Sequence, residues 1–301
     1  MSSTETDNTA LRTYRGNCHC GAFVYEAQLP ELTTVTECNC SICTKKGYLG
    51  VDNDAVAHFK VVKGSLEDLS EYSFGSKSFQ HKFCPICATA VLATRPATAS
   101  GKDIFLNMSF QAHAIQGVNT WTLRRTAIDG AKLGSPYREP TYNGPLPTAQ
   151  VEGGKLYTGS CHCGKLTIAV LNKALEDDEA SGMVECNCSI CERNAYLWVY
   201  PKKDQVVFQA AEQDVGHYRF SHKILAKTFC KTCGVNMANP SNELLTADEV
   251  AALPERKQDH VKRHKTMYPV NVRTLHGVDL TRLHVYRLDG GSKIQPPYVN
   301  P

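Results

Sequence analysis

The sequence lacks any long apolar run. No stretch approaches the roughly 20 consecutive apolar residues that a transmembrane helix needs, although 42% of the 301 residues are hydrophobic. The N-terminal segment is polar and has neither the basic nor the apolar region of a secretory signal peptide. These absences predict a protein of the cytoplasm, or of the nucleus, with no membrane partner.

A large excess of charge of one sign is also missing. The formal net charge is +3, from 33 basic and 30 acidic residues, which is too small to indicate a nucleic-acid surface by itself. Long helical periodicity is scarce. Short segments rich in β-branched and aromatic residues, such as Phe23–Ala27 and Leu166–Val170, predict strands instead. The expected fold class is mainly β.

No cysteine stands outside a pattern. All fourteen fall into one arrangement that occurs twice: a Cys-x-Cys pair, a Cys-x-Cys-x-x-Cys triplet and a Cys-x-x-Cys pair. Disulfides persist mainly in secreted proteins, so these short spacings are interpreted as metal-ligand sets. The first copy contains Cys18, Cys20, Cys38, Cys40, Cys43, Cys84 and Cys87, and the second contains Cys161, Cys163, Cys186, Cys188, Cys191, Cys230 and Cys233.

The repeat extends past the cysteines and predicts a tandem duplication. Glu37–Cys43 recurs without change as Glu185–Cys191, and a stretch rich in proline and glycine separates the copies. The second copy also carries a polar insertion, interpreted as a lid, a partner surface or a solvated excursion. The expected boundaries are 12–135 for the first domain, 136–153 for a linker, 154–298 for the second domain and 242–265 for the insertion.

Seven thiols per copy divide into four plus three, because tetrahedral zinc takes four ligands. The two outer pairs of each copy predict a closed structural site: Cys18, Cys20, Cys84 and Cys87, and Cys161, Cys163, Cys230 and Cys233. The inner three of each copy predict a site with one open position, as in catalytic zinc centres: Cys38, Cys40 and Cys43, and Cys186, Cys188 and Cys191. A histidine or carboxylate as fourth ligand would instead make the inner sites structural.

The ligand type constrains the chemistry of the inner sites. Three thiolates around Zn²⁺ leave a net charge of −1, so the centre is a poorer Lewis acid than a histidine-ligated zinc. Such a soft centre prefers sulfur as its fourth ligand and would hold an incoming thiol as the nucleophilic thiolate. The inner sites therefore favour a thiol substrate over simple hydrolysis.

At these motifs the chain resembles the family of glutathione-dependent formaldehyde-activating enzymes and the related centromere protein V domain. The Gly-x-Cys-x-Cys-Gly, Cys-x-Cys-Ser-x-Cys and Phe-Cys-x-x-Cys motifs match in order in both copies. The resemblance implies two tandem Mss4-like (β-tent) domains, each with an outer structural zinc and an inner catalytic zinc, up to four zinc ions per chain. It also implies a carbon–sulfur lyase, in which glutathione sulfur adds to formaldehyde or the adduct is cleaved in reverse.

Three functions follow from these observations. The first is a zinc-dependent lyase acting on glutathione or a glutathione adduct, with formaldehyde or another conjugate as substrate. The second is a non-catalytic interaction module of the centromere protein V type, which basic or low-complexity tails would favour; none is present. The third is a structural zinc scaffold for partner proteins. Whether the copies pack together as an internal pseudo-dimer stays open.

A few other residues are candidates for lesser roles. Arg273 lies in a segment, Asn271–Thr274, that resembles the family; Asn107–Phe110 is taken as its counterpart and lacks the arginine. Arg273 is a candidate partner for a glutathione carboxylate, although strand arginines more commonly face solvent. His19 and His162, between ligand cysteines, are expected to donate to thiolates or, more commonly, to occupy exposed turns. Ser41 and Ser189 are expected to bond to local backbone or sulfur.

Overall fold

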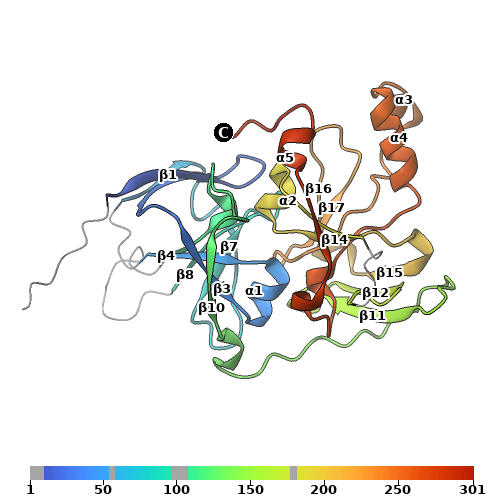
Figure 1. Ribbon diagram of the computed structural model, residues 1–301, viewed down its shortest axis with the longest axis horizontal. Helices are drawn as coiled ribbons and strands as arrows, with labels where there is room; N and C mark the ends of the chain where they lie inside the picture. The colour runs from blue at the N-terminus through green and yellow to red at the C-terminus, as the bar shows by residue number, and fades with distance from the viewer. Residues whose placement is uncertain (1–9, 54–57, 96–107, 177–181) are drawn as a thin grey trace, which may run out of the picture.

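The computed structural model describes residues 10–53, 58–95, 108–176 and 182–301. It is mainly β, with few and short helices, and the two copies form two sheet-rich halves that lie side by side (Figure 1). The expected fold class, mainly β with two tandem halves, is confirmed. Residues 1–9, which carry part of the expectation about targeting, lie outside the described residues.

The two copies repeat one order of elements. The first contains β1 (Arg12–Asn17), β2 (Val24–Leu29), β3 (Thr34–Cys38), α1 (Ser41–Lys46), β4 (Leu49–Asn53), β5 (Phe59–Lys63), β6 (Ser70–Tyr72), β7 (Gln80–Phe83), β8 (Ala90–Thr94), β9 (Met108–Gln111) and β10 (Arg124–Ile128). The second contains β11 (Lys155–Ser160), β12 (Thr167–Asn172), β13 (Met183–Cys186), α2 (Ser189–Arg193), β14 (Leu197–Val199), β15 (Val206–Gln209), β16 (Val215–Tyr218), β17 (Lys227–Cys230), β18 (Asn236–Ala238), α3 (Ala247–Ala251), α4 (Glu255–His264), β19 (Val270–Asn271), β20 (Val285–Leu288) and α5 (Gly290–Lys293).

Each copy folds into two sheets with matching strand orders. The three-stranded sheet β1-β2-β5 corresponds to β11-β12-β15. The seven-stranded sheet β10-β3-β4-β9-β8-β7-β6 corresponds to β20-β13-β14-β19-β18-β17-β16. Because the strands of both sheets match one for one, the duplication seen in the sequence is also present in the topology.

The last strand of each copy returns to the strand that ends at the first inner cysteine. β10 pairs in parallel with β3, so that Ile128 lies opposite Cys38, and β20 pairs in parallel with β13, so that Leu288 lies opposite Cys186. Parallel neighbours need a long connection, and here most of the copy provides it. This pairing places the Asp-Gly dipeptide that follows each of these strands next to the inner cysteines.

The hydrophobic cores are exchanged between the copies. Ile42 of α1 is fully buried in the core of the second copy, and Ile190 of α2 is buried in the core of the first. Tyr196 and Trp198 of the second copy also pack in the first core. Each short helix therefore fills a space that its own copy does not enclose, and neither core is complete without the other copy.

Each copy also ends in a strap that lies on the other copy. Residues 136–140 form the first strap and residues 297–301 the second strap, and both read Pro-Tyr-x-x-Pro. In Figure 1 the chain after β10 runs from the first half to the second, and the C-terminal segment returns over the first half. The proline that ends each strap packs against the glycine after the first Cys-x-Cys pair of the other copy. The expected linker, 136–153, thus begins with an interface element.

The insertion near 242–265 contains α3 and α4. The Thr246 hydroxyl accepts a hydrogen bond from the Glu249 N–H at 3.2 Å, and the Glu249 carboxylate accepts one from the Thr246 N–H at 2.8 Å, which completes the capping box. Val261 and His264 of α4 are buried, whereas α3 has no buried residue, so α4 packs onto the domain and α3 lies mostly in solvent. Among the described residues, every helix is too short or too polar to cross a bilayer.

The exchanged cores predict that both halves unfold together. Replacing Ile42 by Ala, or Ile190 by Ala, is expected to lower the free energy of unfolding by about 2–5 kcal/mol, because each change leaves a cavity in the core of the opposite copy. Denaturant titration followed by circular dichroism measures the loss. The control is Ile86→Ala at a side chain that is 53% exposed, which should change little. Two separate transitions, with Ile42→Ala affecting one alone, would contradict the exchanged cores.

Candidate metal centres

The outer four cysteines of each copy converge on one point. The Sγ atom of Cys20 lies 3.6 Å from that of Cys18 and 3.5 Å from that of Cys84, and the equivalent distances around Cys163 are the same. A tetrahedral zinc with bonds of ~2.3 Å holds its sulfurs ~3.8 Å apart, whereas a disulfide requires ~2.05 Å. All fourteen cysteines are free. Both outer sets therefore fit a metal ion and not a pair of disulfides.

The inner three cysteines of each copy meet at the start of a short helix. Cys38 ends β3, Cys40 precedes α1 and Cys43 lies in its first turn, and the second copy repeats this arrangement with β13 and α2. The three sulfurs of each set lie within 4.8 Å of one another, and among the described residues no histidine or carboxylate joins them. The geometry thus provides three protein ligands per inner set, which leaves one position of a tetrahedral ion for another ligand.

A repeated Asn and Asp-Gly pair holds each inner loop against the last strand. Asn39 donates a hydrogen bond to Asp129 at 2.8 Å, and the equivalent bond in the second copy is 3.0 Å long. A Cβ atom at Gly130 would lie 2.3 Å from the Cys38 sulfur, so only glycine fits there. Sequence reasoning assigned these residues no role at the site. Their recurrence in both copies was the pattern that could have identified them.

Packing three thiols together shifts their pKa values in opposite directions. The hydrogen bond with Cys43 lowers the pKa of Cys38 to about 5, whereas the bonds with Cys38 and Cys40 raise the pKa of Cys43. In the second copy the bond with Cys188 raises the pKa of Cys186 to about 11. Three neighbouring thiolates repel one another, so a bound cation is needed for all three to be deprotonated. The donor set of each inner group therefore suits a divalent metal.

A pocket lies beside the second inner set, at the boundary between the copies. The second copy contributes Cys186 and Cys191 together with the acidic residues Glu185 and Glu192. The first copy contributes His113, Thr120 and Trp121. We call this space the second pocket. A ligand that occupies it lies next to the inner cysteines of one copy and to side chains of the other.

A family model described as "Glutathione-dependent formaldehyde-activating enzyme" matches the chain twice, over residues 13–117 and 156–266. The matched segments together cover more than half of the sequence and contain both sets of cysteine motifs. The chain belongs to this family. A crystal structure of a Rhodobacter sphaeroides protein is also similar: it is 22% identical, over 44% of this chain and 98% of that chain, with a TM-score of 0.32.

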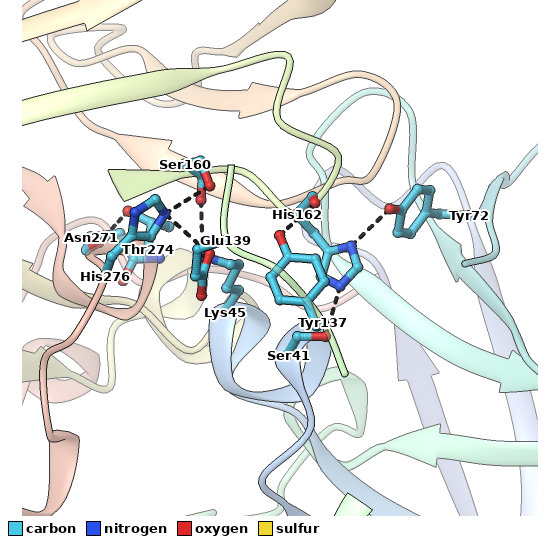
Figure 2. A network of polar contacts seen from close by, with 10 residues as sticks. All are labelled: Ser41, Lys45, Tyr72, Tyr137, Glu139, Ser160, His162, Asn271, Thr274 and His276. Carbon is cyan, nitrogen blue, oxygen red and sulfur yellow. Dashed lines mark hydrogen bonds and ion pairs between the residues drawn. The ribbon is translucent and has the colours of Figure 1, made fainter. Parts of the chain in front are cut away.

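In this member of the family, the histidine between the first two outer cysteines of the second copy joins the two copies. His162 Nε2 lies 2.9 Å from the Ser41 hydroxyl, and Nδ1 lies 2.8 Å from the Tyr72 hydroxyl (Figure 2). Tyr137 of the first strap stacks on the imidazole at 4.3 Å and donates to the His162 carbonyl at 2.7 Å. All three partners come from the first copy or its strap. With 3% of its surface exposed, His162 does not occupy an exposed turn, so that expectation is wrong.

The first copy makes the same contacts with the roles exchanged. His19 Nδ1 lies 2.9 Å from the Tyr218 hydroxyl and Nε2 lies 3.0 Å from the Ser189 hydroxyl. Tyr298 of the second strap stacks on His19 and donates to its carbonyl at 2.6 Å. Burial lowers the pKa of both histidines to about 4, which keeps them neutral. The histidines do not donate to ligand thiolates, and the serines bond across the interface rather than locally.

Basic residues on the short helices bind the straps. Lys45, whose side chain is 3% exposed, pairs with Glu139 of the first strap at 2.9 Å and donates to the Ser160 carbonyl at 3.3 Å (Figure 2). The equivalent residue of α2, Arg193, donates to Asn300 of the second strap at 2.7 Å. Each helix thus contacts one of the two straps. Through these contacts the inner cysteines of one family domain lie against the outer cysteines of the other.

Arg273 lies where the two copies meet. It belongs to a 3₁₀ turn, Val272–Thr274, that packs against α1 of the first copy. Its Nε donates to the Ala195 carbonyl at 2.9 Å, and its guanidinium lies against Gly47 at the end of α1. Burial lowers the pKa of Arg273. The arginine therefore contacts the copy-one helix that carries Cys43, and it does not project freely into solvent.

The counterpart of Arg273 in the first copy is His113. Gly16 forms a bridge with Ile115 as Gly159 does with Leu275, which aligns the two 3₁₀ turns residue by residue. The expected counterpart, Asn107–Phe110, is wrong by four residues; its last three residues belong to β9, and Asn107 lies outside the described residues. The extra residues of the second-copy insertion had obscured the register of the repeat.

The four clusters predict the metal content of the protein. Elemental analysis of the full chain is expected to give four divalent ions per chain, and the Cys20→Ser variant three. The variant should also be strongly destabilised, because a structural zinc contributes on the order of 10 kcal/mol to folding in small peptides. The exposed Ser76→Ala variant is the control and should keep all four ions. Two ions per chain in the wild type, with the inner sets empty, would contradict this reading.

The reciprocal histidine contacts predict matched effects of two distant substitutions. Tyr72→Phe and Tyr218→Phe are each expected to lower the free energy of unfolding by about 1–2 kcal/mol, because each leaves a buried imidazole nitrogen without its partner. Thermal and denaturant unfolding measure both. Tyr286→Phe, at a tyrosine that is 61% exposed, serves as the control. Losses that differ strongly between the two variants would argue against equivalent bridges.

Proposed function

We propose that the protein is a zinc-dependent carbon–sulfur lyase that acts on glutathione or a glutathione adduct. The reaction is the formation or cleavage of S-hydroxymethylglutathione, or of another glutathione conjugate. The observation that carries the proposal is the three-cysteine inner set, because three protein ligands leave one position of a tetrahedral ion for a thiol, and in the second copy Cys186 and Cys191 border the second pocket. Family membership supports a glutathione-related small molecule as substrate. The proposed setting is the cytoplasm or the nucleus.

In this proposal Zn²⁺ is the metal of all four clusters, structural in the outer sets and catalytic in the inner sets. A zinc ion held by an inner set would supply one thing to the chemistry: it would favour the thiolate, the nucleophilic form, of an incoming thiol. Three protein thiolates form a soft set of net charge −1 with the ion, which favours sulfur over the activation of water. The proposed catalytic residues are the ligands Cys38, Cys40, Cys43, Cys186, Cys188 and Cys191.

The covalent step joins sulfur to carbon. The glutathione sulfur forms a bond to the carbonyl carbon of formaldehyde, the carbon–oxygen π bond breaks, and the oxygen takes up the proton that the thiol lost. The reverse reaction breaks the same carbon–sulfur bond. In the second pocket Trp121 and His113 of the first copy line the space together with the cysteines. Arg273, at the junction of the copies, is the candidate contact for a glutathione carboxylate.

Glutathione titration of the cobalt-substituted protein tests the proposal. Cobalt–thiolate charge-transfer bands report each added sulfur, so glutathione is expected to change the spectrum, whereas S-methylglutathione, whose sulfur is blocked, should not. Formation of S-hydroxymethylglutathione from glutathione and formaldehyde, followed by NMR, is expected to exceed the uncatalysed rate and to fall at least about a hundredfold in the Cys40→Ser, Cys188→Ser double variant.

An absent spectral response would overturn the lyase proposal. Four metal ions without any effect of glutathione would indicate that the inner centres are closed or serve another ligand. The alternative function, a non-catalytic interaction module of the centromere protein V type, would then explain the fold better. A spectral response without turnover would keep glutathione as the ligand and assign the chemistry to a different conjugate.

A further inference from the structure

Each hydrophobic core contains the outer cysteines of one copy and the inner cysteines of the other. The outer and inner cysteines that share the first core are Cys18, Cys84, Cys87, Cys186 and Cys191. The second core contains Cys161, Cys230 and Cys233, and the inner cysteines packed against it are Cys40 and Cys43. Packing therefore groups each outer set with the inner set of the opposite copy, and we call each such group a crossed pair.

Hydrogen bonds connect α1 to the residues that flank the second outer set. The Ser41 hydroxyl oxygen lies 2.9 Å from Nε2 of His162, which stands between two outer ligands (Figure 2). The last two residues of α1 donate to carbonyls next to the outer cysteines, at 3.3 and 2.9 Å: Lys45 to Ser160, and Lys46 to Gly234. The helix is thus attached at three points to the two turns that carry the second outer set.

The other crossed pair repeats these three attachments. The Ser189 hydroxyl oxygen at the start of α2 lies 3.0 Å from Nε2 of His19. The next two contacts, at 2.9 and 3.4 Å, are from Arg193 to the Asn17 side chain and from Asn194 to the Cys87 carbonyl. The three attached positions are equivalent in the two helices, although the residue types differ at two of them. The attachments therefore belong to the duplicated interface as a whole.

The ligands of one inner set are held by different copies. Cys38 ends β3, and the next residue, Asn39, bonds to Asp129 of the same copy at 2.8 Å. Cys43 instead lies in α1, and four of the six residues of this helix contact the second copy: Ser41, Ile42, Lys45 and Lys46. The separation of the Cys38 and Cys43 sulfurs, on which the binding of one ion depends, is therefore set by both copies together.

We propose that His19 and His162 are positioning residues, each of which couples the outer metal site of its own copy to the inner metal site of the other. The turn that carries the histidine is fixed when the cysteines on either side of it share an ion. The histidine then holds the start of the helix in the opposite copy. Such coupling is reciprocal, so a filled inner set strengthens metal binding at its crossed outer set by the same factor. The inference needs metal in the inner sets but does not depend on the lyase reaction.

Cadmium NMR of the cadmium-loaded full chain tests the coupling site by site. Each bound ion gives its own signal, and the variants Cys40→Ser and Cys188→Ser identify the signals of the two inner sets. His162→Phe keeps an aromatic ring against Tyr137 but removes the hydrogen bond to Ser41. This variant is expected to shift the signal of the first inner set and to weaken its metal binding about tenfold in competition with EDTA, because a buried hydrogen bond is lost. The second inner set should stay unchanged.

His19→Phe is the matched control, since it makes the same change in the other copy. It should shift and weaken the second inner set and leave the first unchanged. Ser41→Ala should reproduce the effect of His162→Phe on the first inner set. The double variant should lose no more than either single variant, because both substitutions remove the same bond. A general loss of structure would weaken both inner sets together, so a selective effect in the opposite copy is the required result.

Three results would overturn the inference. If His162→Phe weakens the inner set of its own copy, or both inner sets equally, the coupling is not crossed. If neither inner set responds, the histidines hold the interface alone. If the losses from His162→Phe and Ser41→Ala add, the bond between these residues does not carry the coupling.

The proposed function fails on different observations. Wild-type inner signals that ignore glutathione would refute the thiol ligand, whereas the crossed coupling is decided by the histidine variants. If the inner sets of the wild type bind no cadmium, the proposed function and this inference fail together.

Discussion

The close approach of α1 and α2 is the constraint on which the rest of the structure depends. A Cβ atom at Gly47 would lie 2.6 Å from the Cβ of Ala195, so only one of these two equivalent positions has room for a methyl group. Both residues have positive φ, 61° and 49°, a conformation that favours glycine. This meeting of the helix ends directs Ile42 and Ile190 into opposite cores and brings each inner centre to the interface.

Contacts between the centres follow from that approach. Lys46, the last residue of α1, donates to the carbonyl of Gly234, the residue after the final outer cysteine of the second copy, at 2.9 Å. Its ammonium also lies 4.7 Å from the Phe83 ring. In the opposite direction Asn194 donates to the carbonyl of Cys87 at 3.4 Å. The end of each helix that follows the inner cysteines is therefore hydrogen-bonded to the Cys-x-x-Cys pair of the outer site in the other copy. These bonds join the four centres into one connected unit.

The sequence predicted the parts of this arrangement that obey local rules. Cysteines two or three residues apart can share an ion wherever they occur, so the division into outer and inner sets followed from spacing alone, and the strands followed from residue type. The interface obeys no local rule. His19 and Tyr218 are separated by 199 residues, and the residues next to them in the sequence do not indicate that the two side chains meet.

The roles of individual residues were harder to predict for a related reason. His162 looked like a turn residue because its covering ring, Tyr137, comes from a segment that composition identifies as a linker. Arg273 was paired with the wrong segment of the first copy because the insertion lengthens only one of the two repeats. In both cases the missing information was the position of one copy relative to the other, which a repeat pattern does not contain.

The first strap is continuous with the chain that connects the copies, so the interface closes within one molecule. Two separate subunits with the same contacts would part on dilution, whereas a tethered pair keeps a high effective concentration whatever the amount of protein. The tether also ends strict symmetry. In a homodimer any substitution appears on both sides at once, but here Gly47 and Ala195, or His113 and Arg273, can differ. The junction can therefore place a glycine opposite an alanine, and an arginine in one copy where the other has a histidine. Two identical subunits could not combine different residues at equivalent positions in this way.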